Sequence, residues 1–188
     1  MKIKNYFALI SIAAFAGLGL TFTSCGDDAG DDDATGGKGG CSAKMGSSSF
    51  DVPYGFWYLN SELSPSNDES KVVTMEFYSF DPTSAKIPSS MSFVAIEYDL
   101  PDGQREISSI VVEGGKYHVY AATGVTMSSE GFQCETKDGD SNNSDLKIVR
   151  NGNSYSVSIE RATVGDESKN YDFSFSYSGG LSHQVIGE

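Results

Sequence analysis

The chain has 188 residues, of which 26 are acidic and 13 are Lys or Arg, giving a net charge of −13. This negative charge argues against nucleic acid or an anionic membrane surface as the partner. Even without a leader and a tether, the chain is long enough for one domain with its own core.

The first residues have the pattern of a secretory signal peptide. Lys2 and Lys4 are the only charged side chains before Asp27, and a weakly polar run covers residues 6–21. That run is shorter than the roughly 20 apolar residues that a membrane-spanning helix needs. It ends in small residues and not in a cluster of Lys or Arg. We therefore expect residues 1–24 to be removed as a signal peptide.

Cys25 closes the stretch Phe22-Thr23-Ser24-Cys25, with a bulky apolar residue at −3 and a small one at −1. Its thiol can take a diacylglyceryl group as a thioether, and cleavage before it frees an amine for a third acyl chain. Several acyl chains anchor a protein stably. The stretch resembles the lipid-attachment site of bacterial lipoproteins, in the form common in Bacteroidota. It departs from the commonest form, which has Leu at −3 and Ala or Gly near −1. The alternative is an ordinary cysteine after a cleaved signal.

Residues 26–40 contain five Asp, many Gly and nothing apolar larger than Ala. Such a segment buries too little surface to offset its ordering entropy, so we expect residues 25–40 to be a lipidated cysteine and a disordered tether. Adjacent Asp on a flexible chain would bind Ca²⁺ only weakly. Acidic residues directly after the Cys resemble those of surface-exported lipoproteins of Bacteroidota. The resemblance implies a lipid anchor in the outer membrane and display at the cell surface.

The remaining domain, residues 41–188, is acidic and holds two cysteines. Three basic and five acidic residues lie before Cys41, so the domain carries 10 basic and 21 acidic side chains. This charge suits an exported domain or a ligand of cationic character. Disulfides persist outside the cytoplasm, so we predict a bridge between Cys41 and Cys134, which would stabilise by roughly 4–5 kcal/mol. The alternative is two free thiols.

Apolar and polar residues alternate along the domain, as at 73–78, 154–159 and 171–177. This period of two predicts β-strands. Turn signals such as Asn151-Gly152 and Pro101-Asp102-Gly103 separate the runs. We expect strands near 54–60, 71–80, 91–100, 106–113, 116–122, 125–135, 145–150, 153–161 and 171–178. The predicted fold is all-β, an antiparallel, jelly-roll-like β-sandwich, and the alternative is a closed or partly closed β-barrel.

The only Trp lies in an aromatic run, Tyr54-Gly55-Phe56-Trp57-Tyr58. Aromatic rings on the surface of a β-sandwich can stack on sugar faces, so Tyr54, Trp57 and Tyr58 are candidate ligand contacts. Strand alternation equally allows either Trp57 or its neighbours Phe56 and Tyr58 to face the core.

Asp138, Asp140 and Asn142 have the spacing that begins a calcium-binding loop. The loop lacks the Gly expected at its sixth position and the Glu expected at its twelfth. A polar turn between strands has the same composition. We therefore expect an ordinary turn and no cofactor, with calcium bound at these residues as the alternative.

The sequence holds no catalytic motif that we recognise. Of its two histidines, His118 falls on the expected outer face of a strand and His183 in the tail. We therefore expect a surface-anchored, non-enzymatic domain that binds a glycan or a partner protein. The alternatives are a structural subunit of an envelope or fimbria-like assembly, and a hydrolase whose carboxylates meet only in space.

Overall fold

All regular secondary structure in the described residues is β-strand, which confirms the predicted all-β class. The computed structural model describes residues 21–22, 37–59, 72–84, 86, 88–99, 112–113, 117–126, 128–136, 146–166 and 168–185. The strands are β1 (Thr21–Phe22), β2 (Gly37–Met45), β3 (Ser48–Phe50), β4 (Tyr54–Leu59), β5 (Val72–Tyr78), β6 (Met91–Asp99), β7 (Val112–Glu113), β8 (Tyr117–Val125), β9 (Phe132–Thr136), β10 (Leu146–Asn151), β11 (Ser154–Gly165), β12 (Asn170–Gly180) and β13 (Ser182–Val185).

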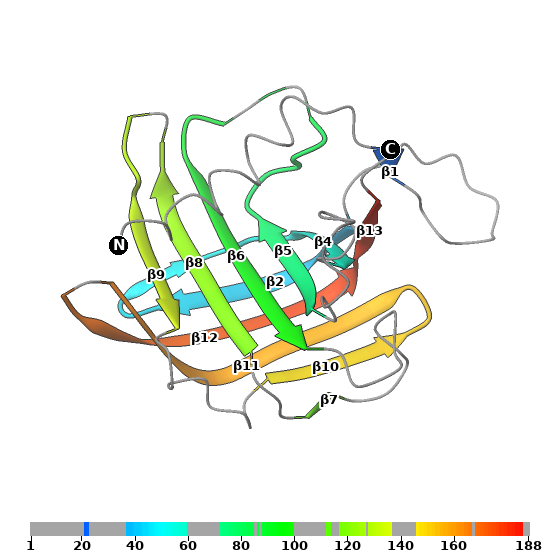
Figure 1. Ribbon diagram of the computed structural model, residues 1–188. Helices are drawn as coiled ribbons and strands as arrows, with labels where there is room; N and C mark the ends of the chain where they lie inside the picture. The colour runs from blue at the N-terminus through cyan, green and yellow to red at the C-terminus, as the bar shows by residue number, and fades with distance from the viewer. Residues whose placement is uncertain are drawn as a thin grey trace, which may run out of the picture.

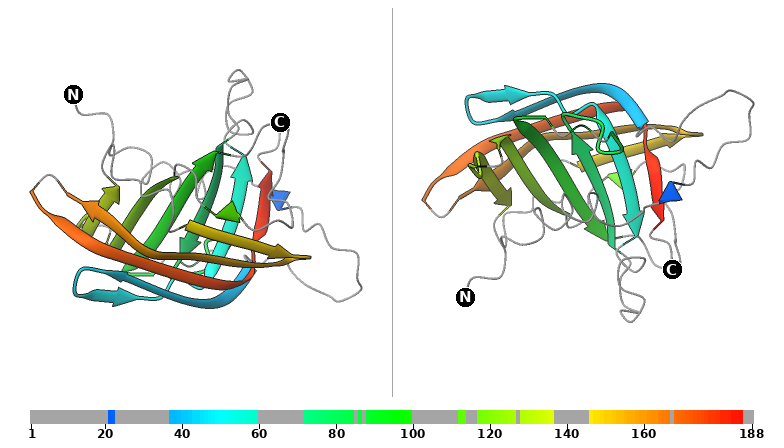
Figure 2. Two further views of the ribbon diagram at one scale, coloured as in Figure 1. Left: turned by 90° about the horizontal axis from the view of Figure 1, so that it is seen from below. Right: turned by 90° about the horizontal axis from the view of Figure 1, so that it is seen from above.

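The strands form two layers that cross each other (Figures 1 and 2). The first layer holds β4, β5, β6, β8 and β9, and the second holds β10, β11, β12, β2 and β3. Pairing of β9 with β11 and of β2 with β4 joins the layers, each over two residue pairs. The sheet thus closes into an irregular ring, with which both a sandwich and a partly closed barrel are compatible.

Neighbouring strands are mostly consecutive in the chain, so the sheet is largely a meander and lacks the Greek-key order of a jelly roll. All described pairings are antiparallel except the one between β13 and β4. Strand β11 is shared, since β10 pairs with its first half and β9 with its last two residues. The predicted turn at Asn151-Gly152 is confirmed as the β10–β11 hairpin, in which Gly152 has a φ of 59°.

The main core lies between the layers and contains the apolar sets predicted from alternation. Phe77 of the first layer packs against Phe175 and Tyr177 of the second, with ring centroids 4.7 and 4.8 Å apart. Burial of such aromatic rings contributes strongly to the stability of a small domain.

Strand β2 corrects the predicted tether, because Gly37–Gly40 belong to the sheet. The glycines allow a close approach between β2 and β12: a Cβ on Gly39 would lie 2.5 Å from the Ser178 carbonyl oxygen. The Tyr177 hydroxyl donates to the carbonyl oxygens of Gly37 and Gly180 and ties the two strands together. A glycine run that reads as flexible in sequence is here a tightly packed strand.

The predicted disulfide is absent, since Cys41 and Cys134 are both free. Cys41 lies on β2 and Cys134 on β9, and β11 and β12 come between these strands in the sheet order. Adjacent strands lie about 4.8 Å apart, whereas a disulfide requires Cα atoms within about 7 Å. The pairing inferred from the cysteine count is therefore wrong, and the alternative of two free thiols holds.

Several expectations fall at or beyond the limits of the described residues. Cys25, residues 26–36 and the candidate calcium ligands Asp138, Asp140 and Asn142 lie outside them, and of the strand expected at 106–113 only β7 lies within them. Within the expected signal peptide, Thr21–Phe22 pair with β13 as strand β1. Strands β2, β3 and β13 were not predicted. The described residues include no helix long and apolar enough to cross a membrane.

Candidate functional site

Trp57, the residue first considered for ligand stacking, is part of the main core. Its side chain is buried, and its ring stacks on His183 of the adjacent strand β13 at 3.9 Å between centroids. Of the other two candidates, Tyr58 is buried and Tyr54 is half-buried, and both belong to the opposite face of β4. Of the two faces of β4 that alternation allowed to face the main core, the structure places the face with Trp57 there.

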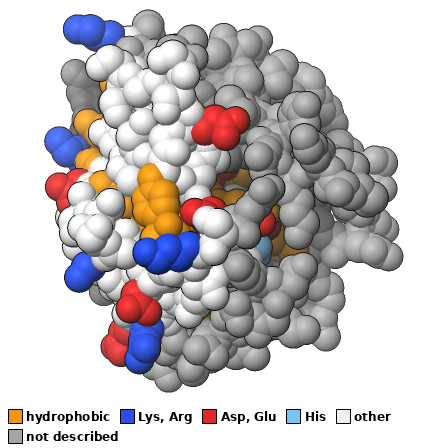
Figure 3. Space-filling view, turned by 90° about the vertical axis from the view of Figure 1, so that its left-hand side faces the viewer, with side chains coloured by type: hydrophobic (Ala, Val, Ile, Leu, Met, Phe, Trp, Pro, Cys, Tyr) orange, Lys and Arg blue, Asp and Glu red, His pale blue; other side chains and the backbone are white. Residues whose placement is uncertain are grey.

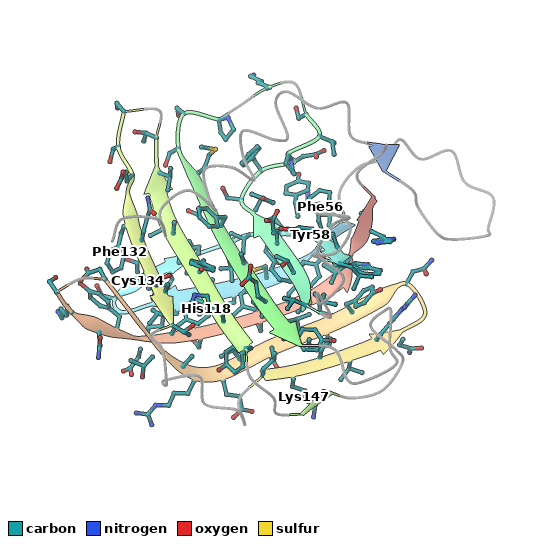
Figure 4. All side chains as sticks on the ribbon, viewed as in Figure 1. Phe56, Tyr58, His118, Phe132, Cys134 and Lys147 are labelled. Atoms are coloured by element: carbon teal, nitrogen blue, oxygen red, sulfur yellow. The ribbon has the colours of Figure 1, made fainter. Side chains whose placement is uncertain are left out.

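The opposite face of the first layer, which we call the outer face, carries a second set of buried side chains. Phe56, Tyr78, Phe93 and Ala122 form an apolar cluster that is separate from the main core. Figure 4 shows Phe56 and Tyr58 on β4 and His118 on β8 of the same layer. A sheet with only one buried face usually carries polar side chains on the other face. The buried apolar cluster therefore distinguishes the outer face from an ordinary solvent-exposed sheet surface.

The strand register orders the outer face into three rows that run across the strands. The polar row joins Tyr58, Thr74, Glu97 and His118. The middle row joins Phe56, Glu76, Ala95, Tyr120 and Glu135. The apolar row joins Tyr54, Tyr78, Phe93 and Ala122. Successive rows lie about 7 Å apart, because side chains on one face recur every second residue.

Glu76 is a buried carboxylate, 5% exposed, that accepts hydrogen bonds from two tyrosines. The Tyr58 hydroxyl donates to Oε1 at 3.0 Å and the Tyr78 hydroxyl donates to Oε2 at 2.5 Å. Burial and the nearby Glu76 charge raise the pKa of both tyrosines well above the ordinary value. Both hydroxyls therefore stay protonated and can donate to Glu76. Through these two hydrogen bonds, Glu76 connects the polar row to the apolar row.

Glu97 is a second carboxylate, half-buried in the middle of the polar row. It lies directly opposite Thr74 on one side and His118 on the other. Burial raises the pKa of Glu97, and the charge of Glu76 raises it further. The two carboxylates are therefore close enough to influence each other electrostatically.

His118 lies at the more exposed end of the polar row. Its Nδ1 is 2.9 Å from the Thr136 hydroxyl, which also accepts a hydrogen bond from the Val119 amide. Its Nε2 is 3.5 Å from Oε2 of Glu135, and the two side chains are 28% and 35% exposed. Figure 3 shows histidine, acidic and apolar side chains close together at the edge of the described surface.

The five strands of the first layer contain no Lys or Arg in their described residues. Their charged residues are Glu76, Glu97, Asp99 and Glu135, with His118 as a titratable neighbour. A surface lined by charges of one sign concentrates ligands of the opposite sign. Aromatic side chains beside a few convergent polar groups are also the usual composition of a small-molecule site.

Comparison of the chain with protein-family models, curated proteins and solved structures found no match. The described residues contain no group of three His, Cys, Asp or Glu that could hold a metal ion.

The sequence pattern placed His118 on the outer face of a strand but identified neither His118 nor Glu76 as part of a site. Alternation gives the face of each side chain and not whether that face is covered. One available signal was the run of aromatic residues on both faces of β4, which is typical of a strand buried on both sides. A second signal was Tyr78, an aromatic residue two positions after Glu76 and therefore on the same face of the strand.

Proposed function

We propose that the chain is a lipid-anchored, non-enzymatic binding protein, displayed on the surface of the outer membrane, whose ligand is bound at the outer face of the first layer. The lipobox resemblance at Cys25 supports the location. The observation that carries the binding role is the outer face itself, where Glu76, Glu97 and His118 lie beside an aromatic cluster outside the main core.

The composition of the outer face distinguishes it from an ordinary sheet surface. A buried carboxylate costs free energy unless it is hydrogen-bonded, and Glu76 has two tyrosine donors that hold its oxygens in place. Preorganised polar groups of this kind fix the orientation of a ligand. Because Glu76 and the apolar cluster are buried, the side chains that a ligand could touch are their partly exposed neighbours Glu97, His118 and Tyr120. The partly exposed His118 and Glu135 give solvent access to one end of the site.

The lipid anchor is tested by labelling cells with palmitate. The wild-type chain is expected to incorporate the label, and Cys25→Ala is expected to lose it. Protease treatment of intact cells tests surface display. A chain that is fully protected in intact cells but cleaved after lysis would refute display at the surface.

The binding role is tested by a thermal-shift screen of the full chain against a panel of neutral glycans, carboxylic acids and organic amines. A ligand of the outer face should raise the Tm of the wild type and lose most of that effect in Tyr120→Ala. Glu160→Gln is the matched control, because Glu160 is exposed on the second layer. If no compound raises the Tm, or if the shift is the same in Tyr120→Ala as in the wild type, this role is contradicted.

A hydrolase is the second candidate, because Glu76 and Glu97 are neighbouring carboxylates in unlike environments. Such pairs divide the roles of acid and base in several hydrolases. Activity on chromogenic esters or glycosides that disappears in Glu97→Gln would favour this reading over simple binding.

A further inference from the structure

We propose that Asn151 is a site of spontaneous covalent modification, at which the Asn151-Gly152 linkage converts through a succinimide to aspartate and isoaspartate. The inference goes beyond the proposed binding function and does not depend on it. It follows from the geometry of the β10–β11 hairpin, from the charge of Arg150 and from a second asparagine, Asn153, in the same turn.

The hairpin turn leaves space around the reacting atoms. Residues 151–154 are all exposed, and Figure 1 shows the turn at the end of β10 and β11. Gly152 has a φ of 59°, and a Cβ built on it would meet nothing within 4 Å. Because glycine has no side chain to shield its own nitrogen, the Asn151 side chain can approach that atom.

The two asparagines of the turn differ in the amide that follows them. Gly152 lies outside the strand ladder, and within the described residues its N–H donates no hydrogen bond. Ser154, which follows Asn153, lies opposite Asn151 and closes the turn as a hydrogen-bond donor. Asn151 therefore precedes a free amide and Asn153 precedes a bonded one, although both side chains are exposed.

The reaction needs only water and base. The deprotonated Gly152 nitrogen attacks Cγ of Asn151, the new N–Cγ bond closes a five-membered ring, and the side-chain amide leaves as ammonia. Water then opens the ring. Cleavage of the N–Cγ bond gives aspartate, whereas cleavage at the original backbone carbonyl carbon gives isoaspartate, with the chain continuing through Cγ. No oxidant or reductant takes part.

Arg150 brings a positive charge close to the attacking nitrogen. Its Nε donates to the Gly152 carbonyl oxygen at 3.0 Å, and its guanidinium lies 5.5 Å from the centre of the Tyr155 ring. A nearby cation favours the deprotonated form of a titrating group. The turn therefore favours the form of the Gly152 amide that attacks.

Ring closure requires the end of the hairpin to open. Asn151 and Ser154 form the last of the residue pairs between β10 and β11, and the extended strand must give way there before the ring can form. Exposed ends of strands open at little cost in free energy. The folded chain is therefore expected to react more slowly than the unfolded chain, but still to react.

Isoaspartate would change the hairpin as well as its charge. It adds one carbon atom to the backbone of β10 and replaces an amide by a carboxylate. Leu146 and Ile148 of the same strand are buried in the main core, and their positions depend on the register of β10 with β11. The isoaspartyl form, separated by ion exchange, is expected to have a lower Tm than the unmodified chain.

The test incubates the full chain at neutral pH and follows both asparagines by peptide mapping, with electron-transfer fragmentation to distinguish aspartate from isoaspartate. In the folded chain Asn151 should react on the order of ten-fold faster than Asn153, because Asn153 has a bulkier successor whose amide is bonded. Arg150→Gln should slow Asn151 about three-fold, as expected for an exposed charge. Asn151→Gln should abolish the modified peptide.

Ser154→Gly separates the effect of glycine from that of the free amide. It gives Asn153 a glycine successor whose N–H stays bonded, so Asn153 should remain slow in the folded chain and become fast only in urea. A fast Asn153 in the folded variant would overturn the geometric argument.

Equal rates at Asn151 and Asn153 in the folded wild type, or an Asn151 that reacts only in urea, would overturn the assignment itself. None of these outcomes bears on ligand binding at the outer face, because Asn151 belongs to the second layer.

Discussion

The Tyr78 hydroxyl donates a 2.5 Å hydrogen bond to Glu76, which lies two residues earlier on the same strand and on the same face. Tyr58 of the neighbouring strand donates to the other carboxylate oxygen. The three residues form a buried unit outside the main core, in which each donor depends on the same acceptor. Removal of one donor therefore leaves part of a buried carboxylate less well satisfied.

Tyr78→Phe is expected to lower the free energy of unfolding by about 1–3 kcal/mol, because Glu76 loses the Tyr78 hydroxyl as a donor while the ring remains. Urea unfolding followed by circular dichroism measures this change. Tyr54→Phe is the control, since Tyr54 is half-buried on the same face and lies opposite Tyr78. Equal effects of the two substitutions would argue that the bond to Glu76 is unimportant.

Glu97→Gln is expected to stabilise the fold at neutral pH. The raised pKa means that folded Glu97 holds its proton more tightly than unfolded Glu97, whose ordinary value is 4.5. Its charge therefore destabilises the fold above the raised pKa, and this effect disappears as the pH falls below the ordinary value. The titratable groups near Glu97 are Glu76, Tyr58 and His118.

Thermal unfolding of wild type and Glu97→Gln from pH 4 to pH 8 measures this dependence. The Tm of the variant should exceed that of the wild type at pH 7–8, and the difference should vanish near pH 4. A difference that stays constant over this range would show that the charge of Glu97 is not its cause.

Gly39→Ala is expected to destabilise the domain by at least about 2 kcal/mol, because the new methyl group would lie against a backbone oxygen that cannot move alone. A Cβ on Gly39 would be 2.5 Å from the Ser178 carbonyl oxygen, whereas one on Gly40 would be 4.0 Å from that atom. Gly40→Ala is therefore a matched control and should change stability by less than about 1 kcal/mol. Chemical unfolding of both variants tests the packing of β2 on β12.

Cys41 and Cys134 are expected to react slowly with iodoacetamide in the folded chain. Burial raises the pKa of each thiol to about 11. Because only the thiolate reacts, alkylation at pH 7.5 should be on the order of 100-fold slower than for an unperturbed cysteine. Peptide mapping by mass spectrometry measures each site, with the unfolded chain as the fast reference. A Cys41–Cys134 linked peptide in a non-reducing digest of exported protein would contradict the two free thiols.

Alternation could predict much of the fold because each strand of the main core has one face that is apolar throughout. The runs 154–159 and 171–177 show this clearly, and both are strands whose expected inner residues are buried except for the half-buried Tyr171. The alternation at 73–78 also sets Glu76 on the face of β5 opposite its core residues. It could not show that Glu76 is buried there, because burial of a second face depends on contacts that a period of two does not encode.

Other features of the fold depend on distances between strands, which the amino-acid composition does not reveal. The glycines of β2 are typical of a flexible segment, and only their approach to β12 shows why glycine is needed there. Likewise, an even number of cysteines in a chain expected to be exported suggests a disulfide, but the order of the strands keeps Cys41 and Cys134 apart.

The pairing of β2 with β12 has a consequence for how the chain would fold after the expected export. Residues 39–45 near the start of the domain pair with residues 173–179 near its end. A chain that crosses a membrane from its N-terminus presents β2 first and its partner almost last. Neighbouring strands such as β4, β5 and β6 can pair early, but β2 must wait, and long-range pairing of this kind slows folding. A chain truncated before β12 would leave β2, the strand next to the expected tether, without its longest pairing.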